Sequence, residues 1–478
     1  MGREARQIGG TVFLSVPNGH SVANLLRGGV LRALVEEGRR HVVLLSPFCG
    51  DPAFRDEFDH PRLTHEPLAP HRPGVLERVI ESVLSEKFLL ESRLTAVRLQ
   101  RDRARLTEPW PGRRVLAGTK GGVSRLPLSR RSWYRALRAV TPTRGYDRLL
   151  DRYRPALVVT ATAGFFLAEA PLICAAWRAG VPQMAVDLGW DNLSSKYHTI
   201  MPVDGLVLWN EPMRQEAIAY HGFDPGQVHV SGPVQFDHYF RGDALPSREE
   251  FLRAVGADTS RRLVTLATTP KTMYPSTLRL VDALASAIRD GRLGPPAQLV
   301  VRVHPRDDLD VYDQFGATSW VRVEKPLGRL AAAEGLPPYD AVSPSSRDRV
   351  HLAATLAYSD VLVNFASTTT IEACIFDTPV VNVGVDEEPD LPLPLSIRRY
   401  YAYEHYQPVV ESGAVPVATT LDELVAHVRR GLEHPEERRA ARRALVGRLC
   451  PFQDGGAARR VARAIEAAAD GARLEGAA

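Results

Sequence analysis

The sequence is poor in cysteine, has no long apolar run and shows no strong excess of charge of one sign. Its four cysteines lie far apart, at positions 49, 174, 374 and 450, and form neither a metal-ligand spacing nor a disulfide framework. No run of about 18 apolar residues is present, so no transmembrane helix is expected. The first seven residues include three charged side chains and lack the apolar core of a signal peptide. These absences favour a cytoplasmic protein and exclude disulfide-rich and membrane-spanning classes.

The length of 478 residues is too great for one ordinary core and predicts two domains. Short apolar runs alternate with helical segments, which indicates mostly parallel sheets with helices on both faces. The first series of predicted strands covers residues 12–16, 41–46, 156–160, 183–186, 206–209 and 228–230. The second covers residues 263–267, 299–303, 321–323, 361–363 and 380–383. We therefore predict an α/β fold of two doubly wound, Rossmann-like domains facing across a cleft, with residues 1–240 in the first and 241–478 in the second.

A helical insertion near residues 73–150 interrupts the first series. Residues 76–97 have the apolar spacing of an amphipathic helix, and residues 93–144 contain fourteen Lys or Arg against two acidic residues. This basic segment carries a net charge of +12, whereas the whole chain carries +4. Two interpretations stay open: a packed excursion with a solvated basic face, or a surface that makes peripheral contact with the inner face of a membrane or with an anionic acceptor.

The first predicted strand runs directly into Pro17, Asn18, Gly19 and His20, after which apolar residues recur at helical spacing. Backbone amides at such a strand-to-helix loop often hold small ligands. We therefore expect Asn18 and Gly19 to lie in an acceptor or ligand loop. His20 has the ordinary pKa range of a general base and is a candidate catalytic residue. A histidine that only caps or packs the helix is the alternative.

The stretch from Asp187 to Lys196 also follows a predicted strand and is rich in polar side chains. We expect Trp190, Asn192 and Lys196 to line an acceptor or ligand loop, with Lys196 neutralising a phosphate. Asp191 is the second candidate catalytic residue. An Asx turn followed by a helix N-cap would explain the same pattern.

Two loops of the second series carry groups suited to a diphosphate. Thr268, Thr269 and Lys271 follow its first strand and offer hydroxyl groups and a cation. Arg302 and His304 lie at the end of the next strand, where a solvated turn is the alternative interpretation.

A third loop gives the strongest local signal. Ser367, Thr368 and Thr369 open a helix directly after the predicted strand 361–363, so the free amides of its first turn point toward an anion. Glu372 lies within the first turns, where a carboxylate can accept hydrogen bonds from a ribose. A capping box alone would give the same spacing.

These residues resemble a known family. RVHP at 302–305 and STTTIEACIFDTPVVNV at 367–383 resemble the donor half of the GT-B glycosyltransferases, and are similar to the CDP-glycerol glycerophosphotransferases and the UDP-GlcNAc 2-epimerases. GWDNLSSK at 189–196 resembles the glycerophosphotransferase-like and surface-carbohydrate transferase branch. PNGH at 17–20 looks like the loop after the first strand of GT-B enzymes, and residues 450–466 resemble their closing helix.

The resemblance implies a division of roles between the two domains. The second domain would bind a nucleotide donor, with Ser367, Thr368 and Thr369 at its diphosphate and Glu372 at its ribose. His304 would lie near the diphosphate or the nucleotide. The first domain would bind the acceptor, with His20 as the base.

The predicted function is a nucleotide-sugar-dependent glycosyltransferase acting on a cell-surface polysaccharide, a glycolipid or a related saccharide or lipid-linked acceptor, with no nucleic-acid partner. Helix amides and nearby cations would stabilise the leaving diphosphate, so no metal and no further cofactor are expected. The donor nucleotide, UDP, GDP, CDP or dTDP, is not distinguished. A CDP-glycerol-type glycerophosphotransferase, a UDP-sugar 2-epimerase and a nucleotide-binding protein without turnover are the alternatives.

Overall fold

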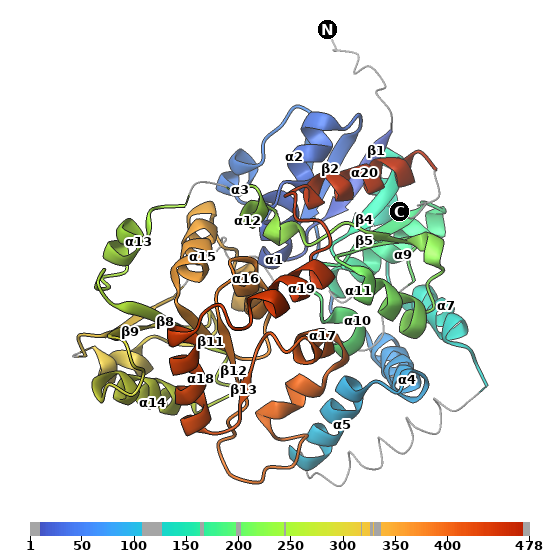
Figure 1. Cartoon of the computed structure of the whole chain (residues 1–478). Coiled ribbons are helices and arrows are strands. Elements are labelled where there is room, and N and C mark those ends of the chain that lie inside the picture. The colour runs from blue at the N-terminus through green and yellow to red at the C-terminus, as the bar shows by residue number, and fades with distance from the viewer. Residues whose placement is uncertain are drawn as a thin grey trace.

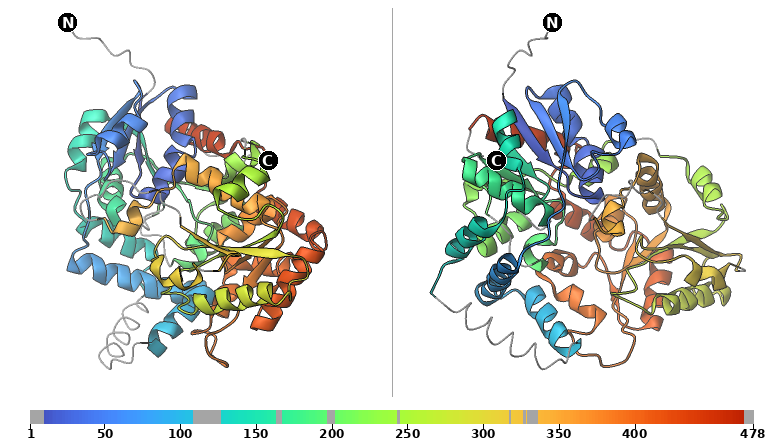
Figure 2. Two further views of the ribbon diagram at one scale, coloured as in Figure 1. Left: turned by 90° about the vertical axis from the view of Figure 1, so that its left-hand side faces the viewer. Right: turned by 180° about the vertical axis from the view of Figure 1, so that it is seen from behind.

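Two parallel sheets organise the chain (Figures 1 and 2). The computed structural model describes residues 10–107, 127–162, 167–196, 202–242, 245–316, 318–325, 328 and 336–471. The first sheet has the strand order β3-β2-β1-β4-β5-β6-β7. Its strands are β1 (Thr11–Ser15), β2 (His41–Ser46), β3 (Leu63–Pro67), β4 (Pro155–Thr160), β5 (Gln183–Val186), β6 (Gly205–Leu208) and β7 (Val228–Val230).

The second sheet has the order β10-β9-β8-β11-β12-β13. Its strands are β8 (Arg262–Ala267), β9 (Ala297–Arg302), β10 (Val321–Glu324), β11 (Val361–Asn364), β12 (Val380–Val383) and β13 (Val417–Ala418). Every pairing in both sheets is parallel. Because a parallel sheet needs helical crossovers on its faces, this topology is that of two doubly wound α/β units. The predicted fold class is confirmed, and the predicted boundary at residue 240 falls between β7 and β8.

The sequence did not predict two of these strands. β3 reads LTHEP, lies at the edge of its sheet and is only partly buried, so it lacks the apolar run of a central strand. β13 is an edge strand of two residues. A strand at the edge of a sheet is less buried than a central one. Its sequence therefore lacks the continuous apolar run from which a strand is predicted.

Helices cover the sheets, and the helix expected directly after β1 is divided into short pieces. Apolar spacing over residues 21–37 predicts one helix, but the structure has α1 (Gly19–Ser21), a π-helical turn, α2 (Val30–Arg32) and a second π-helical turn. Gly29 lies between the two parts with φ of 101°, a left-handed conformation that ends regular helix and that glycine adopts readily.

The other helices of the first half, apart from the insertion, are α3 (Pro52–Glu57), α8 (Tyr146–Tyr153), α9 (Ala170–Ala179), α10 (Asn192–Ser195), α11 (Glu211–Glu216) and α12 (Asp237–Phe240). Those that follow are α13 (Arg248–Ala254), α14 (Thr277–Arg289), α15 (Ser346–Tyr358), α16 (Thr368–Ile375), α17 (Gln407–Glu411), α18 (Leu421–Glu433), α19 (Arg439–Leu449) and α20 (Ala457–Ala469).

The insertion forms α4 (Val75–Ser92), α5 (Thr95–Thr107) and α7 (Arg130–Val140). Ile80 and Leu84 of α4 pack with Leu137 of α7 and with α9 in a small apolar cluster. The first turn of α5 contacts the second half of the chain, because Glu404 accepts hydrogen bonds from the amides of Thr95 and Ala96. These helices are therefore packed on both halves. Part of the basic segment, residues 108–126, lies outside the described residues, and membrane contact stays a prediction.

The two halves meet in a shared apolar cluster, beside the separate cores of their two sheets. A single cluster joins Trp190 and Trp209 of the first half to Leu362, Ile371 and other buried residues of the second. Within the described ranges, no helix is both long enough and apolar enough to cross a bilayer.

The last helix, α20, returns to the first half of the chain. It packs against α2 and β4 (Figure 1), and its apolar face belongs to the core of the first sheet. The buried carboxylate of Asp237 accepts hydrogen bonds from the amides of Ala457 at 2.9 Å and Ala458 at 2.8 Å. A side chain remote in sequence thus caps the N-terminus of α20, where the helix dipole favours negative charge.

We predict that Asp237→Ala loosens α20. The substitution leaves two buried amides without their acceptor, which costs about 1–2 kcal/mol. Hydrogen exchange of the amides in residues 457–469 should accelerate, and the urea midpoint should fall. Asp282→Ala, at an exposed position of α14, is the matched control and should change neither. Equal exchange in both variants would contradict the capping role.

Candidate functional site

The residues predicted to act chemically follow the carboxyl ends of the strands. The loops after β1 and β5 carry those of the first half, and the loops after β8, β9 and β11 carry those of the second. In parallel α/β sheets ligands bind at these ends, where helix N-termini and loop amides converge. The candidate site is therefore built from the two sheets' carboxyl edges.

The loop after β1 brings the two halves into close contact. A Cβ on Gly19 would lie 2.3 Å from the carbonyl oxygen of Val342 in the second half, so only glycine allows this approach. The buried side chain of Asn18 caps α1 by accepting a hydrogen bond from the amide of Ser21 at 2.9 Å. Asn18 thus shapes the loop, and a ligand-binding role for it stays a prediction.

His20 projects from this loop and remains accessible to solvent. Desolvation of the ring by the protein packed around it lowers the pKa of its imidazole. A hydrogen bond to the backbone of Leu188 and the charge of Asp191 partly offset that effect. His20 and Asp191, the two candidate catalytic residues, therefore lie within electrostatic reach of one another.

The loop after β5 forms the second part of the first-half site. Asn192 donates a hydrogen bond from its amide to Asp187, and Lys196 forms an ion pair with Asp191 at 2.9 Å. Burial opposes ionisation of Asp191, but attraction from Lys196 and His405 outweighs it and lowers the pKa of that carboxyl. Asp191 is thus held as an anion beside a partly exposed ammonium group.

Two carboxyl groups close to this loop have raised pKa values, in contrast to the lowered pKa of Asp191. Burial raises the pKa of Asp187 to about 7, although hydrogen bonds from Gly189 and Asn192 favour its charged form. Burial raises the pKa of Glu216 to about 8, with repulsion from Glu404 adding to the effect. Both groups therefore titrate near neutral pH, a property that is frequent at functional sites.

His405, which sequence reasoning missed, enters this site from the second half. Its ring packs edge-on against Trp190 with the ring centroids 5.2 Å apart. Burial lowers the pKa of His405 to about 4, which the charge of Asp191 partly offsets. Its Nδ1 atom is buried and has no hydrogen-bond partner among the described residues. No periodicity or spacing in the sequence links residue 405 to residue 190.

The N-terminus of α16 is held by a buried polar network. Ser367 caps the helix by accepting a hydrogen bond from the amide of Thr369 at 3.3 Å. Thr370 lies 3.0 Å from the hydroxyl of Tyr406, which donates to Asn382 at 2.6 Å. The ring of Tyr406 in turn packs against Trp190, centroid to centroid 5.5 Å. One tyrosine therefore links the first turn of α16 to the loop after β5.

Glu372 lies one turn further along α16 and is already engaged. It is buried and accepts a hydrogen bond from the Tyr239 hydroxyl at 2.6 Å. Burial raises the pKa of its carboxyl, while hydrogen bonds from Tyr239 and Thr368 and the nearby charge of Arg302 oppose the shift. Arg302 itself pairs with Glu324 at 2.6 Å. A contact between Glu372 and a ribose stays a prediction.

The loops after β8 and β9 are tied to each other. The hydroxyl of Thr268 accepts a hydrogen bond from the amide of His304 at 2.8 Å. Burial lowers the pKa of His304 to about 4, so its imidazole is neutral at physiological pH. The ammonium group of Lys271 lies 3.8 Å from Asp308 at the surface and is largely exposed. Thr269 is partly buried beside Met273.

The structure thus places the predicted residues in groups. His20, Asp191 and Lys196 lie within electrostatic range of one another. The charge of Arg302 favours the ionised form of Glu372, and the hydroxyl of Thr268 accepts a hydrogen bond from the amide of His304. In the described part of the chain, no group of three or more histidine, cysteine, aspartate or glutamate side chains could hold a metal ion.

Comparison with known proteins agrees with this architecture. Residues 351–467 match the sequence model of the family described as CDP-Glycerol:Poly(glycerophosphate) glycerophosphotransferase, and this range includes α16. None of the curated proteins compared with the chain matches it.

Solved structures resemble nearly the whole chain. The UDP-GlcNAc 2-epimerase from Methanocaldococcus jannaschii is 12% identical with a TM-score of 0.52, covering 95% of this chain and 98% of its own. The UDP-GlcNAc 2-epimerase from Neisseria meningitidis, solved with UDP-GlcNAc, is 9% identical with a TM-score of 0.51 and the same coverage. A glycosyltransferase from Rickettsia africae is 11% identical with a TM-score of 0.51, covering 96% and 98%. The chain has the GT-B fold of these proteins.

We predict that Glu216→Gln makes the folded state less sensitive to pH. The carboxyl of Glu216 has its pKa raised from 4.5 to about 8, so the folded state holds a proton that the unfolded state has lost over that range. Stability from this group is therefore present below pH 4.5 and declines as the pH rises toward 8. The variant should melt at a higher temperature than the parent at pH 8 and at the same temperature at pH 4.5.

Glu211→Gln is the matched control, since Glu211 is an exposed residue of the same helix. It should keep the parent's dependence of melting temperature on pH. If Glu216→Gln also keeps that dependence, the buried carboxyl does not titrate as described.

Proposed function

From the GT-B fold and the arrangement of its two carboxyl edges, we propose that the protein is a nucleotide-sugar-dependent glycosyltransferase. The observation that carries the proposal is the link through Tyr406, which joins the first turn of α16 to the loop that holds Trp190 and Asp191. This arrangement suits a reaction in which a donor on the second half meets an acceptor on the first.

The donor side relies on α16. Its first-turn amides and the positive end of its dipole would stabilise the diphosphate as it leaves, without a metal ion. Ser367 keeps that turn in place by capping it. Glu372, one turn further along the same helix, would accept a hydrogen bond from a ribose. The family match over residues 351–467 and the solved neighbours named for UDP-GlcNAc support a nucleotide-linked donor.

The acceptor side relies on His20. An acceptor hydroxyl needs a base as it attacks the anomeric carbon, and an accessible imidazole of lowered pKa is unprotonated at neutral pH. Asp191 would then stabilise the imidazolium that forms, because its negative charge raises the proton affinity of His20. Saccharide and lipid-linked acceptors both present such a hydroxyl.

A glycerophosphotransferase is the second candidate, because the matching family transfers glycerophosphate. It would use the same α16 site for a CDP-linked alcohol, but the attacked atom would be phosphorus. An epimerase of the same fold would convert a UDP-sugar with no acceptor present. The nature of the donor and the need for an acceptor separate these reactions.

We predict that one nucleotide diphosphate among UDP, GDP, CDP and dTDP raises the melting temperature well above the others, because it binds only the folded state. Glu372→Gln should weaken that nucleotide about tenfold by removing the charge from a ribose contact, while keeping the acceptor for Tyr239. Glu388→Gln, at an exposed position of the second half, is the control. Mass spectrometry with UDP-sugars and CDP-glycerol then identifies the transferred group; absence of binding by all four diphosphates would contradict the proposal.

We further predict that His20→Ala lowers kcat at least about a hundredfold and leaves donor affinity unchanged, as expected for loss of a general base. The rate of the parent should fall at acid pH as His20 becomes protonated, and the variant should lose that dependence. His60→Ala, in the turn before β3, serves as the control. If His20→Ala keeps the kcat of the parent, His20 is not the general base.

A further inference from the structure

The imidazole of His20 contacts a buried side chain of its own helical segment. Asn24 follows His20 by four residues, the spacing that places two side chains on one face of a helix. Asn24 is 4% exposed, whereas His20 lies at the surface. The Asn24 amide donates a hydrogen bond from Nδ2 to the backbone carbonyl of His20 at 2.8 Å. Because a carbonyl only accepts, this bond fixes which end of the amide faces His20.

The same Nδ2 atom also lies against the ring of His20. It is 3.3 Å from Nδ1 and 3.3 Å from Nε2. The two ring nitrogens flank Cε1, so an atom that approached the edge of the ring at this equal distance from both would overlap Cε1. Nδ2 therefore lies over the face of the imidazole. The amide holds the plane of the ring in this way without occupying the edge at either nitrogen.

The edges of the ring are used by other groups. The hydrogen bond to the backbone of Leu188 raises the pKa of His20, which is the effect of a carbonyl that accepts from a ring N–H. One ring nitrogen therefore carries the proton that Leu188 accepts. The other nitrogen is unprotonated in the neutral imidazole and directs its lone pair outward in the plane of the ring, where an acceptor hydroxyl can donate to it.

The backbone around Asn24 is irregular but fixed. Asn18 and Ser21 cap each other at the start of α1, which contains His20. The π-helical turn Val22–Leu26 follows directly and contains Asn24, and the amide of Arg27 donates to the carbonyl of Val22 at 3.1 Å. Such turns are rare and are frequent at functional sites. His20 and Asn24 are therefore both carried by hydrogen-bonded turns that fix their separation.

We propose that Asn24 is a positioning residue for His20, whose ring it holds with one nitrogen directed toward the acceptor hydroxyl. This inference rests on the proposed function: the hydroxyl proton moves to that nitrogen as the oxygen bonds to the anomeric carbon and the diphosphate leaves with the electron pair of its broken bond. The amide N–H over the ring is the positive end of a dipole and disfavours the imidazolium ion. Asn24 thus also keeps His20 neutral before the acceptor reacts.

The test replaces the Asn24 amide with a carboxylate in the full chain. In Asn24→Asp a negative oxygen faces the ring and stabilises the imidazolium ion, so the pKa of His20 should rise by about one unit or more. NMR of protein labelled at the histidine Cε1 atoms measures this pKa, and His20→Ala identifies the signal among those of the fourteen histidines. The acid limb of the pH profile of kcat should move to higher pH by the same amount.

Asn210→Asp is the matched control. Asn210 is also buried and donates from Nδ2 to a backbone carbonyl, that of Leu449, but it caps α11. This variant should leave the pKa of His20 at the parent value. Asn24→Leu, similar in shape, removes the amide without adding charge. It should lower kcat about tenfold and leave the rise in melting temperature caused by the nucleotide diphosphate unchanged.

The inference is overturned if folded Asn24→Asp titrates at His20 as the parent does, or if Asn24→Leu keeps the kcat of the parent. Should Asn24→Asp fail to fold, the kcat and the nucleotide response of Asn24→Leu decide the question. The NMR titration needs no turnover, so the two proposals fail on different results. A titration that shifts as expected, together with a parent-like kcat in His20→Ala, contradicts the proposed base and not the contact of Asn24 with the ring.

Discussion

The contact of Trp190 with His405 and Tyr406 is the interaction on which the candidate site depends. The ring of Tyr406 is fully buried against the first half, and its hydroxyl holds Asn382 and Thr370 in the second. A shift of either half would expose an aromatic ring and leave buried polar groups without partners, and both changes are costly. The first turn of α16 is therefore positioned relative to Asp191 before any ligand arrives, which is the preorganisation that group transfer requires.

This contact also brings several acidic side chains together, with few cationic side chains near them. Glu216 lies within electrostatic range of Asp187, Asp191 and Glu404, whereas Lys196 and His405 act on Asp191. The protein resolves the repulsion in three ways. Asp191 pairs with Lys196, Glu404 accepts hydrogen bonds from the α5 amides, and Asp187 and Glu216 have pKa values high enough to hold protons near neutral pH. The insertion thus contributes to the charge balance of the site as well as to its packing.

Sequence patterns predicted the parts of this structure that depend on local chemistry. The central strands are apolar runs, and Ser367 at the start of α16 is a local cap, so both could be identified from neighbouring residues. His405 and Tyr406 could not, because their role arises from contact with Trp190, more than two hundred residues away. The capping of α20 by Asp237 and the close approach of Gly19 to Val342 are likewise tertiary effects that leave no periodic signal.

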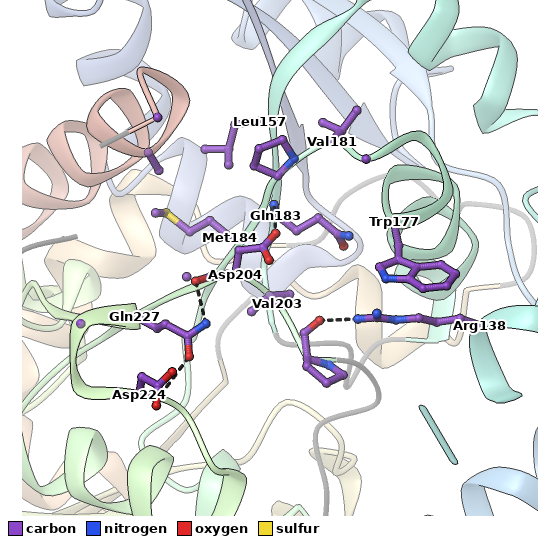
Figure 3. Close-up of a pocket in the computed structure, with 17 residues that line it drawn as sticks. Arg138, Leu157, Trp177, Val181, Gln183, Met184, Val203, Asp204, Asp224 and Gln227 are labelled. Atoms are coloured by element: carbon purple, nitrogen blue, oxygen red, sulfur yellow. Dashed lines mark hydrogen bonds between the residues drawn. The ribbon is translucent and has the colours of Figure 1, made fainter. Parts of the chain in front are cut away.

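The loop that holds Asp191 follows a strand that is anchored at both ends. Gln183 begins β5, and its backbone amide donates to Asp204 at 2.9 Å (Figure 3). Asp187 follows the end of β5, and its carboxylate accepts hydrogen bonds from the amide of Gly189 and the side chain of Asn192. Because both ends of the strand are anchored, the loop after β5 presents Asp191 and Trp190 in a fixed position, and Tyr406 can hold the first turn of α16 against it.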